Sequence, residues 1–435
     1  MLDPKLIRDH PEAVRQAARL KGIGSPELVD AWLAADEQRR LAQAEADALR
    51  AEQGRLGAQV GKLKGQLKGG TSPELESLLQ QATRVKERYE QAAARQAEAE
   101  AEARRIMLQL PAIPDPSWPV GTDATQNKVV RTWDNGQIRP VPLGTGRRSH
   151  IELGTDLGIL DFDRGVKLAG SRSYVVRGAG ALLYHAVLRF AMDVLTARGY
   201  EPFVVPVLVT EKAMEGTGYF PAGRDQAYIT QDQSVLVGTS EVSLASFYGG
   251  EILEESLLPQ RMCALSTCFR REAGAAGKDT AGLYRVHQFD KVEQVVVHAA
   301  DEAEHIRLHE EIMANSEHIL QQLGLPYRVV QNCTGDMGQG KWRMYDIETW
   351  MPSRNEYGET HSGSALKDFQ SRRLNLRYRK TGEKQPAFCY TLNNTAIACP
   401  RILIAILENY QNTDGSVSVP PVLRPYMNGI EQIRR

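Results

Sequence analysis

Residues 266–294 read STCFRREAGAAGKDTAGLYRVHQFDKVEQ, and this stretch decides the fold. Residues 273–277 are small and free to bend, which is typical of a loop. Residues 285–293 then alternate as a β-strand does. Every second residue of that strand shares one face: Arg285, His287, Phe289, Lys291 and Glu293. The stretch therefore predicts two antiparallel strands joined by a long loop.

The predicted hairpin gathers arginines, carboxylates and an aromatic ring near one ligand. Arginine forks bind phosphate or carboxylate, a ring stacks on a base, and an acid holds an ammonium group. Any one of these residues alone is more often part of a solvated surface. Because the whole set occurs on a strand flanked by apolar runs, the pattern favours a binding site.

The same stretch resembles the second signature motif of class II aminoacyl-tRNA synthetases. It matches the seryl-tRNA synthetase form without a gap, FR-x-E-AG-x-x-G-[KR]-D-T followed by GL-x-RVHQF-x-KVEQ. The resemblance covers the whole chain and ends at residues 419–427, VPPVLRPYM. It implies an α+β fold with an antiparallel β-sheet catalytic core and an N-terminal antiparallel coiled-coil arm. Irregular ordering of the expected strands and helices also favours α+β, and no P-loop or Rossmann glycine motif is present.

Length and composition set broad limits on the protein. A chain of 435 residues predicts two domains, and a net charge of −1 says nothing about nucleic acid. The five cysteines lack C-x-x-C spacing, which predicts reduced, mostly buried thiols and not a zinc site. The charged N-terminus and the absence of a run of about 18 apolar residues predict a soluble, cytoplasmic protein outside the membrane.

Two long heptad patterns occupy the N-terminal region. The first runs from the helix start at 25–27 to Lys68 with Ala42, Leu49, Leu56 and Leu63 seven apart, and the second follows Gly69-Gly70 with Leu78, Val85, Ala92, Ala99 and Ile106. These seams predict an antiparallel coiled-coil hairpin about 60 Å long. A helical pair packed on the body, or a dimerisation coil, remains open.

Charge is uneven along this hairpin. Its far end carries four cations and no acid between residues 53 and 68: Arg55, Lys62, Lys64 and Lys68. A basic tip indicates a polyanionic partner, although a solvated helix end has the same composition. With the resemblance, these four residues are expected to bind tRNA(Ser).

The remaining domain and element boundaries are predicted from residues that interrupt helices and strands. Proline and glycine between residues 111 and 148 predict a linker, and the expected domains are 1–112 and 113–435. A helix over 182–198 is expected to precede a strand over 200–208, in which Pro206 indicates an edge strand or a break. This pair resembles the first class II motif, which implies a homodimer.

The resemblance also implies the site residues. Those expected at ATP are Arg270, Arg271, Glu272, Arg285, Val286, Phe289, Glu359, Thr360, His361, Ser362 and Arg401, with Arg270 and Arg401 catalytic. Those expected at serine are Thr239, Ser240, Glu241, Arg270, Glu293, Asn393 and Thr395. Glu359 and Ser362 offer the hard oxygens that Mg²⁺ prefers. The asparagine pair at 393–394 is placed in a polar turn before an apolar helix that Arg401 opens.

Together these features predict a cytoplasmic enzyme that activates L-serine with ATP and charges tRNA(Ser). A second candidate substrate is tRNA(Sec). A paralogue that activates an amino acid for a carrier protein is the first alternative, although it would tend to lose the long arm. A non-catalytic coiled coil that binds nucleic acid is the second. That protein would have no need of Arg270, Glu272, Glu293 and Arg401 together.

Overall fold

The computed structural model describes residues 1–144, 146–274, 277 and 279–435, which leaves Thr145, Ala275, Ala276 and Lys278 outside the described residues. The chain forms two compact units. The arm unit comprises Leu2–Arg19 and Ile23–Leu110, and the sheet unit comprises Met1, Leu20–Gly22 and Pro111–Arg435.

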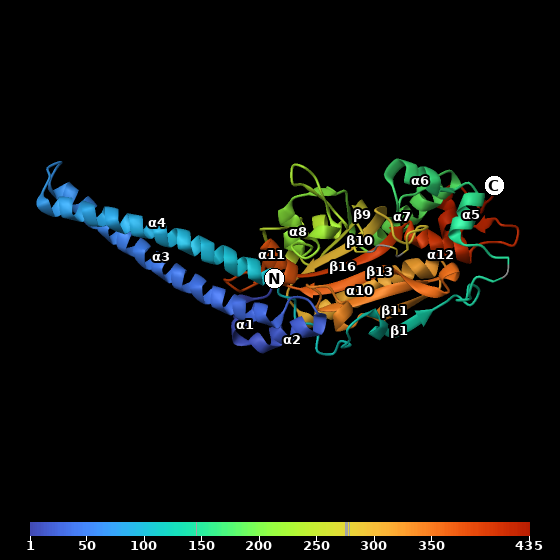
Figure 1. Ribbon diagram of the computed structural model, residues 1–435, viewed down its shortest axis with the longest axis horizontal. Helices are drawn as coiled ribbons and strands as arrows, with labels where there is room; N and C mark the ends of the chain where they lie inside the picture. Colours follow the sequence, from blue (N-terminus) through green and yellow to red (C-terminus); the bar gives the residue numbers. More distant parts are fainter. Residues whose placement is uncertain (145, 275–276, 278) are drawn as a thin grey trace. The chain divides into compact units, whose positions relative to one another are not determined.

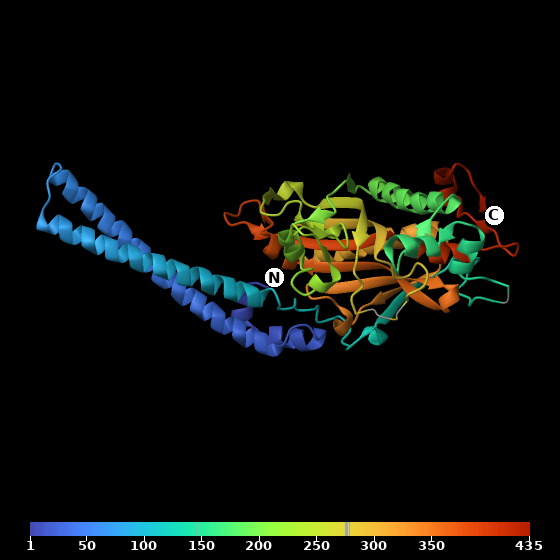
Figure 2. The ribbon, with the colours of Figure 1, turned by 45° about the horizontal axis from the view of Figure 1, so that its top comes forward.

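The arm unit is helical throughout. Its helices are α1 (Pro4–Asp9), α2 (Pro11–Lys21), α3 (Pro26–Gln66) and α4 (Pro73–Met107). Figures 1 and 2 show α3 and α4 alongside one another and joined by a turn. Alanine, leucine and valine from both helices bury their side chains along the seam, from Ala46 and Leu49 to Val85 and Ala92. The predicted helical hairpin is confirmed, because a heptad repeat leaves each helix with one apolar stripe to cover.

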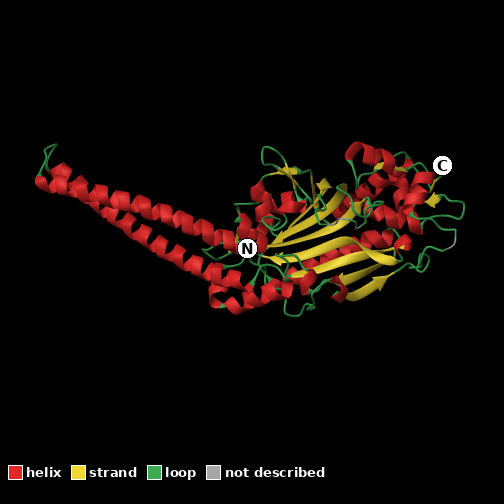
Figure 3. Ribbon diagram, viewed as in Figure 1, coloured by secondary structure: helices red, strands yellow, loops and turns green. Residues whose placement is uncertain are grey.

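The sheet unit is built on eight strands, drawn in yellow in Figure 3. In sheet order they are β1 (Lys128–Trp133), β11 (Tyr327–Gln331), β12 (Arg343–Met351), β13 (Glu356–Lys367), β16 (Tyr390–Cys399), β10 (Gln288–His298), β9 (Gln260–Phe269) and β4 (Glu201–Phe203). Every neighbouring pair is antiparallel except β4 with β9. The α+β prediction is confirmed, with one parallel strand at the edge.

Helices and small sheets complete this unit. The helices are α5 (His150–Asp156), α6 (Phe162–Ala169), α7 (Ala179–Ala197), α8 (Glu211–Thr217), α9 (Glu241–Ser246), α10 (Glu302–Gln322), α11 (Phe369–Leu374) and α12 (Arg401–Asn409). The short strands are β2 (Leu160–Asp161), β3 (Val175–Val176), β5 (Leu208–Val209), β6 (Tyr228–Ile229), β7 (Val235–Leu236), β8 (Ile252–Glu254), β14 (Arg377–Arg379), β15 (Ala387–Phe388), β17 (Val417–Ser418) and β18 (Gln432–Ile433).

Strand β10 separates two cores. Its even-numbered Val292 and Val296 pack in one core with α7, α10 and α12, and its odd-numbered Val295 and Val297 pack in another with α9. Side chains of a strand alternate between faces, so the odd face is the one that also carries Phe289, Lys291 and Glu293. Helix α7 is long and apolar enough to span a membrane by composition, but half of that window is buried. A core helix passes the same test.

Two local predictions are wrong, and a third is confirmed. The predicted linker contains β1, an edge strand that pairs with β11 and needs few apolar residues because most of it stays exposed. The edge or break expected at Pro206 is present, because β4 is the edge strand and ends at Phe203, and β5 begins at Leu208. The predicted polar turn at 391–396 lies inside β16.

Buried polar side chains in β16 are tolerated because they find partners. The Asn394 side-chain amide donates to the Ile312 carbonyl at 2.7 Å and to the Ser316 hydroxyl at 2.9 Å. Such hydrogen bonds remove most of the cost of burying an amide. The five cysteines are all buried and free, as their spacing predicted.

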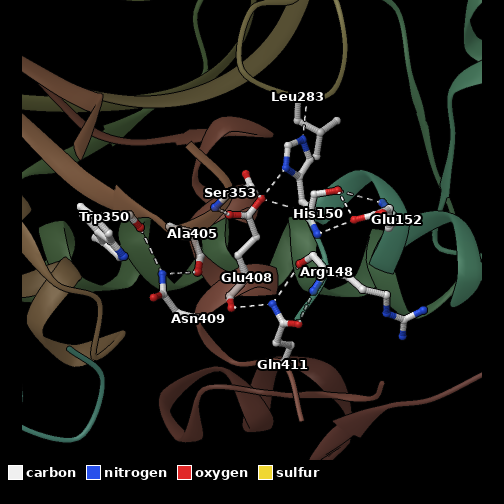
Figure 4. A network of polar contacts seen from close by, with 11 residues as sticks. Arg148, His150, Glu152, Leu283, Trp350, Ser353, Ala405, Glu408, Asn409 and Gln411 are labelled. Carbon is white, nitrogen blue, oxygen red and sulfur yellow. Dashed lines mark hydrogen bonds and ion pairs between the residues drawn. The ribbon is translucent and has the colours of Figure 1, made fainter. Parts of the chain in front are cut away.

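The buried carboxylate of Glu408 holds α12, the helix that begins at Arg401, in place (Figure 4). Glu408 on α12 lies 2.7 Å from the His150 ring and accepts hydrogen bonds from the amide and hydroxyl of Ser353 at 2.8 and 2.6 Å. Burial opposes its charge, but these contacts outweigh burial and lower the pKa of Glu408. The other ring nitrogen of His150 accepts the amide of Leu283, so one network ties α5 and α12 to a loop that lines the site.

Candidate active site

Two neighbouring strands of the sheet, β9 and β10, carry several of the predicted site residues. Strands β9 and β10 pair from Phe269 opposite Gln288 onward, which confirms the predicted antiparallel hairpin. The second strand was expected to begin at Arg285 but begins at Gln288. The His287 amide donates to the carbonyl of Arg172 instead of to β9, so Arg285 and His287 belong to the loop.

A cavity of about 520 Å³, part of it open to solvent, lies at this end of the sheet. Nearly all the residues predicted for ATP line it: Arg270, Glu272, Arg285, Val286, Phe289, Glu359, Thr360, His361 and Arg401. An adjoining cavity shares Arg270, Glu272, Arg285, Glu359 and Arg401 and continues past Tyr219 and Gly238. Segments far apart in sequence therefore meet at one place.

The two consecutive arginines have different surroundings. The Arg270 guanidinium lies 5.1 Å from the centre of the Phe289 ring, and its Nη2 donates to the Gly238 carbonyl at 3.4 Å. Arg271 instead lines a separate surface cavity with Arg224 and Tyr228. The structure therefore brings Arg270 into the candidate site and leaves Arg271 outside its lining.

The other charged groups at the mouth are held by specific contacts. Arg285 Nη1 pairs with Glu272 Oε2 at 2.7 Å. Arg401, the first residue of α12, donates to the carbonyls of Tyr284 and Glu359 at 3.0 and 2.8 Å. Its guanidinium also lies 4.4 Å from the centre of the Tyr284 ring. A guanidinium at a helix N-terminus adds its charge to the positive end of the helix dipole, which favours phosphate.

A second group of predicted residues lies deeper. Glu241 is 3% exposed and accepts hydrogen bonds from the Tyr219 hydroxyl at 2.6 Å, Gln370 at 2.8 Å and Asn393 at 2.7 Å. Thr239 and Ser240 are buried beside it, and the Glu241 amide donates to the Thr239 hydroxyl. Glu241 is the first residue of α9, and its buried carboxylate is held there by three hydrogen-bond donors.

Glu293 is the other buried carboxylate of this region. It is 1% exposed, forms an ion pair with Lys291 and accepts a hydrogen bond from Thr395 at 3.4 Å. Burial raises the pKa of Glu293, and the charge of Glu241 acts in the same direction, so the two carboxylates are close enough to interact. Two buried acids with neighbouring donors suit a small ligand that carries an ammonium and a hydroxyl group.

The two predicted metal ligands, Glu359 and Ser362, lie on one strand, β13. Ser362 on β13 pairs with Asp346 on β12, and Glu359 precedes it on the same strand. Asp346 is buried, its Oδ1 lacks a hydrogen-bond partner among the described residues, and burial followed by the charge of Glu359 raises its pKa. Two carboxylates and a hydroxyl are a donor set that fits a hard divalent cation.

His361 is part of the core next to this site. It is buried, its Nδ1 lies 2.8 Å from the Thr360 hydroxyl, and burial lowers its pKa to about 3. A neutral, buried ring agrees with core packing better than with a catalytic base. The basic tip residues lie in the arm unit, where Arg55, Lys62, Lys64 and Lys68 are all exposed.

Residues that sequence reasoning missed and that the structure adds to the site include Tyr219, Tyr284, Lys291, Asp346 and Gln370. Lys291 had a usable signal, because it lies on the same strand face as Phe289 and Glu293. Tyr219 and Gln370 reach Glu241 from α8 and α11 regions distant in sequence, and no local pattern marks them.

Comparison with known proteins adds independent findings. Two family descriptions match, the seryl-tRNA synthetase N-terminal domain over residues 1–114 and the tRNA synthetase class II core domain (G, H, P, S and T) over residues 228–410. The serine–tRNA ligase of Symbiobacterium thermophilum is 40% identical over all of both chains, and that of Deinococcus radiodurans is 42% identical over 99% of this chain and 98% of its own.

A solved structure gives the same result. The seryl-tRNA synthetase from Pyrococcus horikoshii, complexed with ATP, is 36% identical and superposes with a TM-score of 0.88 over 100% of this chain and 99% of its own. The chain belongs to the seryl-tRNA synthetase family.

Proposed function

We propose that the protein activates L-serine with ATP to form seryl-adenylate and then transfers serine to the 3′ end of tRNA(Ser). One observation carries this proposal. A cavity edged by three arginines is lined by Lys291 and Thr395, the partners of the buried Glu293, and the adjoining cavity is lined by Tyr219, a partner of the buried Glu241. Cations suit the phosphates of ATP, and buried carboxylates suit a small amino acid.

The first reaction is an in-line displacement. A carboxylate oxygen of serine attacks the α-phosphorus, the bond to the β-phosphate breaks, and pyrophosphate leaves with the electron pair. A carboxylate needs no protein base, so positioning and charge neutralisation supply the rate. In this proposal Arg270 neutralises the α-phosphate and the serine carboxylate, while Arg285 and Arg401 hold the γ end.

The base and the amino acid are recognised by the remaining residues. Glu272 accepts from the adenine amino group, and the Phe289 ring stacks on the base, with Val286, Thr360 and His361 as walls. Thr239, Ser240, Glu241, Glu293, Asn393 and Thr395 form the serine pocket. Arg271 lines a different cavity, so we assign it no contact with ATP.

Mg²⁺ is part of this proposal. Glu359 and Ser362 would hold it, with Asp346 as the buried carboxylate next to Ser362. When bound, the ion would offset the charge of the phosphates. The protein's own contribution is a set of oxygen ligands fixed on two paired strands.

The second reaction passes serine to RNA. A ribose hydroxyl of the terminal adenosine attacks the serine carbonyl carbon, and AMP leaves. The arm is proposed to bind tRNA(Ser) through the exposed tip cations, with tRNA(Sec) as a further candidate substrate. The division into domains 1–112 and 113–435 follows the same logic, and the compact units and the match over residues 1–114 support it.

A homodimer is proposed from the exposed edge near β4. Val204 is fully exposed, and Leu208 and Leu265 are about half exposed. Apolar side chains gathered at a sheet edge are typical of a surface that a second copy covers. Light scattering at micromolar concentration should give twice the 48.3 kDa mass of one chain.

Serine-dependent exchange of pyrophosphate into ATP tests the proposed activity. A pocket built to hydrogen-bond a hydroxyl rejects an analogue that lacks it by roughly 10⁴–10⁵, whereas an added methyl group is rejected by about 10–200-fold. Alanine should therefore be almost inert and threonine the stronger competitor. Equal exchange with serine and alanine would contradict the pocket assignment, and acylation of a carrier protein in place of tRNA would favour the paralogue alternative.

A further inference from the structure

Lys291 is a buried cation that none of the roles above uses. It lies on β10 between Phe289 and Glu293, on the face that lines the cavity, and it is 6% exposed. Burying an ammonium group is costly unless it is paired. Its partners should therefore show what its charge does.

The contacts of Lys291 form a closed set with two proposed serine residues. Its Nζ forms an ion pair with Glu293 Oε2 and lies 3.5 Å from the Thr395 hydroxyl. That hydroxyl is in turn 3.4 Å from the same Glu293 oxygen. By contrast, among the described residues the ammonium group of the buried Lys21 donates to the backbone carbonyls of residues 338, 339 and 341, and Lys21 lines no described cavity.

The charges around Glu293 come from three elements. Lys291 lies on the same strand as Glu293, Glu241 is at the start of α9, and Lys341 lies just before β12. The charges of all three act on Glu293. Glu241 has three uncharged donors of its own, in Tyr219, Gln370 and Asn393. Burial and Glu241 raise the pKa of Glu293, whereas Lys291 and Lys341 lower it. Two neighbouring buried carboxylates cannot both stay ionised without such compensation.

We infer that Lys291 is a positioning residue for serine, because its ammonium group keeps the Glu293 carboxylate ionised and directed into the serine pocket. The inference rests on the proposed function, since it assumes that Glu293 contacts serine. A carboxylate accepts from both ammonium and hydroxyl groups, whereas a protonated acid loses much of that capacity. Lys291 therefore sets the affinity for serine through Glu293.

Lys291→Met tests this inference, because methionine fills a similar volume without charge. Serine KM and ATP KM are measured in the full-length protein by pyrophosphate exchange from pH 7 to pH 9. Each unit by which the pKa of Glu293 exceeds the working pH lowers its ionised fraction about tenfold. We expect serine KM at pH 7 to rise at least about tenfold, ATP KM to stay within about threefold, and serine KM to fall as the pH rises.

Three further variants separate charge from packing. Glu293→Gln should weaken serine binding with no such recovery at high pH, and the double variant with Lys291→Met should be equally insensitive. Lys291→Arg keeps the charge and should retain a serine KM that does not fall with pH. Lys367→Met is the control, because Lys367 lies on β13 of the same sheet and pairs with Glu302 on α10, but lines no described cavity.

A pH-independent serine KM in Lys291→Met, or a parallel rise in ATP KM, would overturn the inference. ATP-induced thermal stabilisation reports whether the variant is folded, and Lys291→Gln replaces Lys291→Met if it is not. If the wild-type protein showed no serine-dependent exchange, the proposed function would fail first. If instead the wild-type protein were active and Lys291→Met had the same serine KM, only the inference about Lys291 would fail.

Discussion

The arm unit is held together by one kind of contact that is repeated, whereas the sheet unit depends on contacts that are each made once. In α3 and α4 the same contact recurs along the seam, made by alanine, leucine and valine seven residues apart. In the sheet unit, each site contact is made once, such as Arg285 with Glu272 or Gln370 with Glu241. A repeated contact tolerates the loss of one member, whereas a single contact does not, so the two regions should respond very differently to substitution.

The largest effect is expected in the sheet unit. Arg270→Ala should lower pyrophosphate exchange by about 10³-fold or more, because it removes the cation next to the reacting phosphate. Arg271→Ala is the control, since Arg271 is the neighbouring residue but lines a different cavity. It should change exchange by less than about threefold. Equal losses from both substitutions would show that the two side chains share the site.

Deleting the arm should separate the two regions. Replacing residues 31–107 with a short Gly/Ser linker removes the helical hairpin but none of the proposed ATP or serine residues, which lie between 239 and 401. Exchange should stay within a few-fold, and charging of tRNA(Ser) should fall by roughly 10²-fold or more through lost RNA binding. Normal charging by the shortened protein would mean that the arm serves packing or dimerisation.

A smaller effect is expected from the arm tip alone. Replacing Arg55, Lys62, Lys64 and Lys68 with alanine should weaken charging by about tenfold and flatten its dependence on salt, because fewer phosphates are neutralised. The control replaces Arg84, Lys86 and Arg88, which are exposed in the middle of α4. If this control weakened charging as much as the tip variant, the tip would not be the contact that matters.

The smallest effect concerns acid stability, where only the sheet unit should respond. His298 lies 2.7 Å from His305, and burial lowers its pKa to about 4, whereas the unfolded value is about 6.5. The unfolded chain therefore binds the proton first, and stability is lost as pH falls from about 6.5 towards 4. At pH 5 this one histidine should cost about 2 kcal/mol.

Urea unfolding at pH 7 and pH 5 measures that loss. His298→Gln should lose less stability than the wild type between the two pH values, and the exposed His185→Gln should behave like the wild type. Hydrogen exchange by residue should show the loss in the sheet unit but not in α3 or α4, which contain no histidine. An equal loss in the arm helices would contradict the comparison.

Local patterns in the sequence were enough to predict the helical arm and the hairpin of β9 and β10. A heptad repeat indicates which face of each helix is buried. The second helix begins after Gly69-Gly70 as predicted, at Pro73, and the Ser72 hydroxyl accepts a hydrogen bond from the Leu75 amide. The alternation around Phe289 and Glu293 likewise placed both on one strand face. In each case the residues that decide the structure are neighbours in the chain.

Tertiary structure alone decided the rest. Strand β1 is held by pairing with β11, some 200 residues later, so a proline- and glycine-rich context hid it. The polar residues of β16 read as a turn because their burial depends on partners in α10. Glu241 acquires its donors from Tyr219 and Gln370, and Arg271 leaves the site that Arg270 enters, through contacts that sequence spacing does not encode. Burial and hydrogen bonding of a side chain depend on residues that are distant in the sequence and meet only in the folded chain. A local sequence pattern therefore cannot predict them.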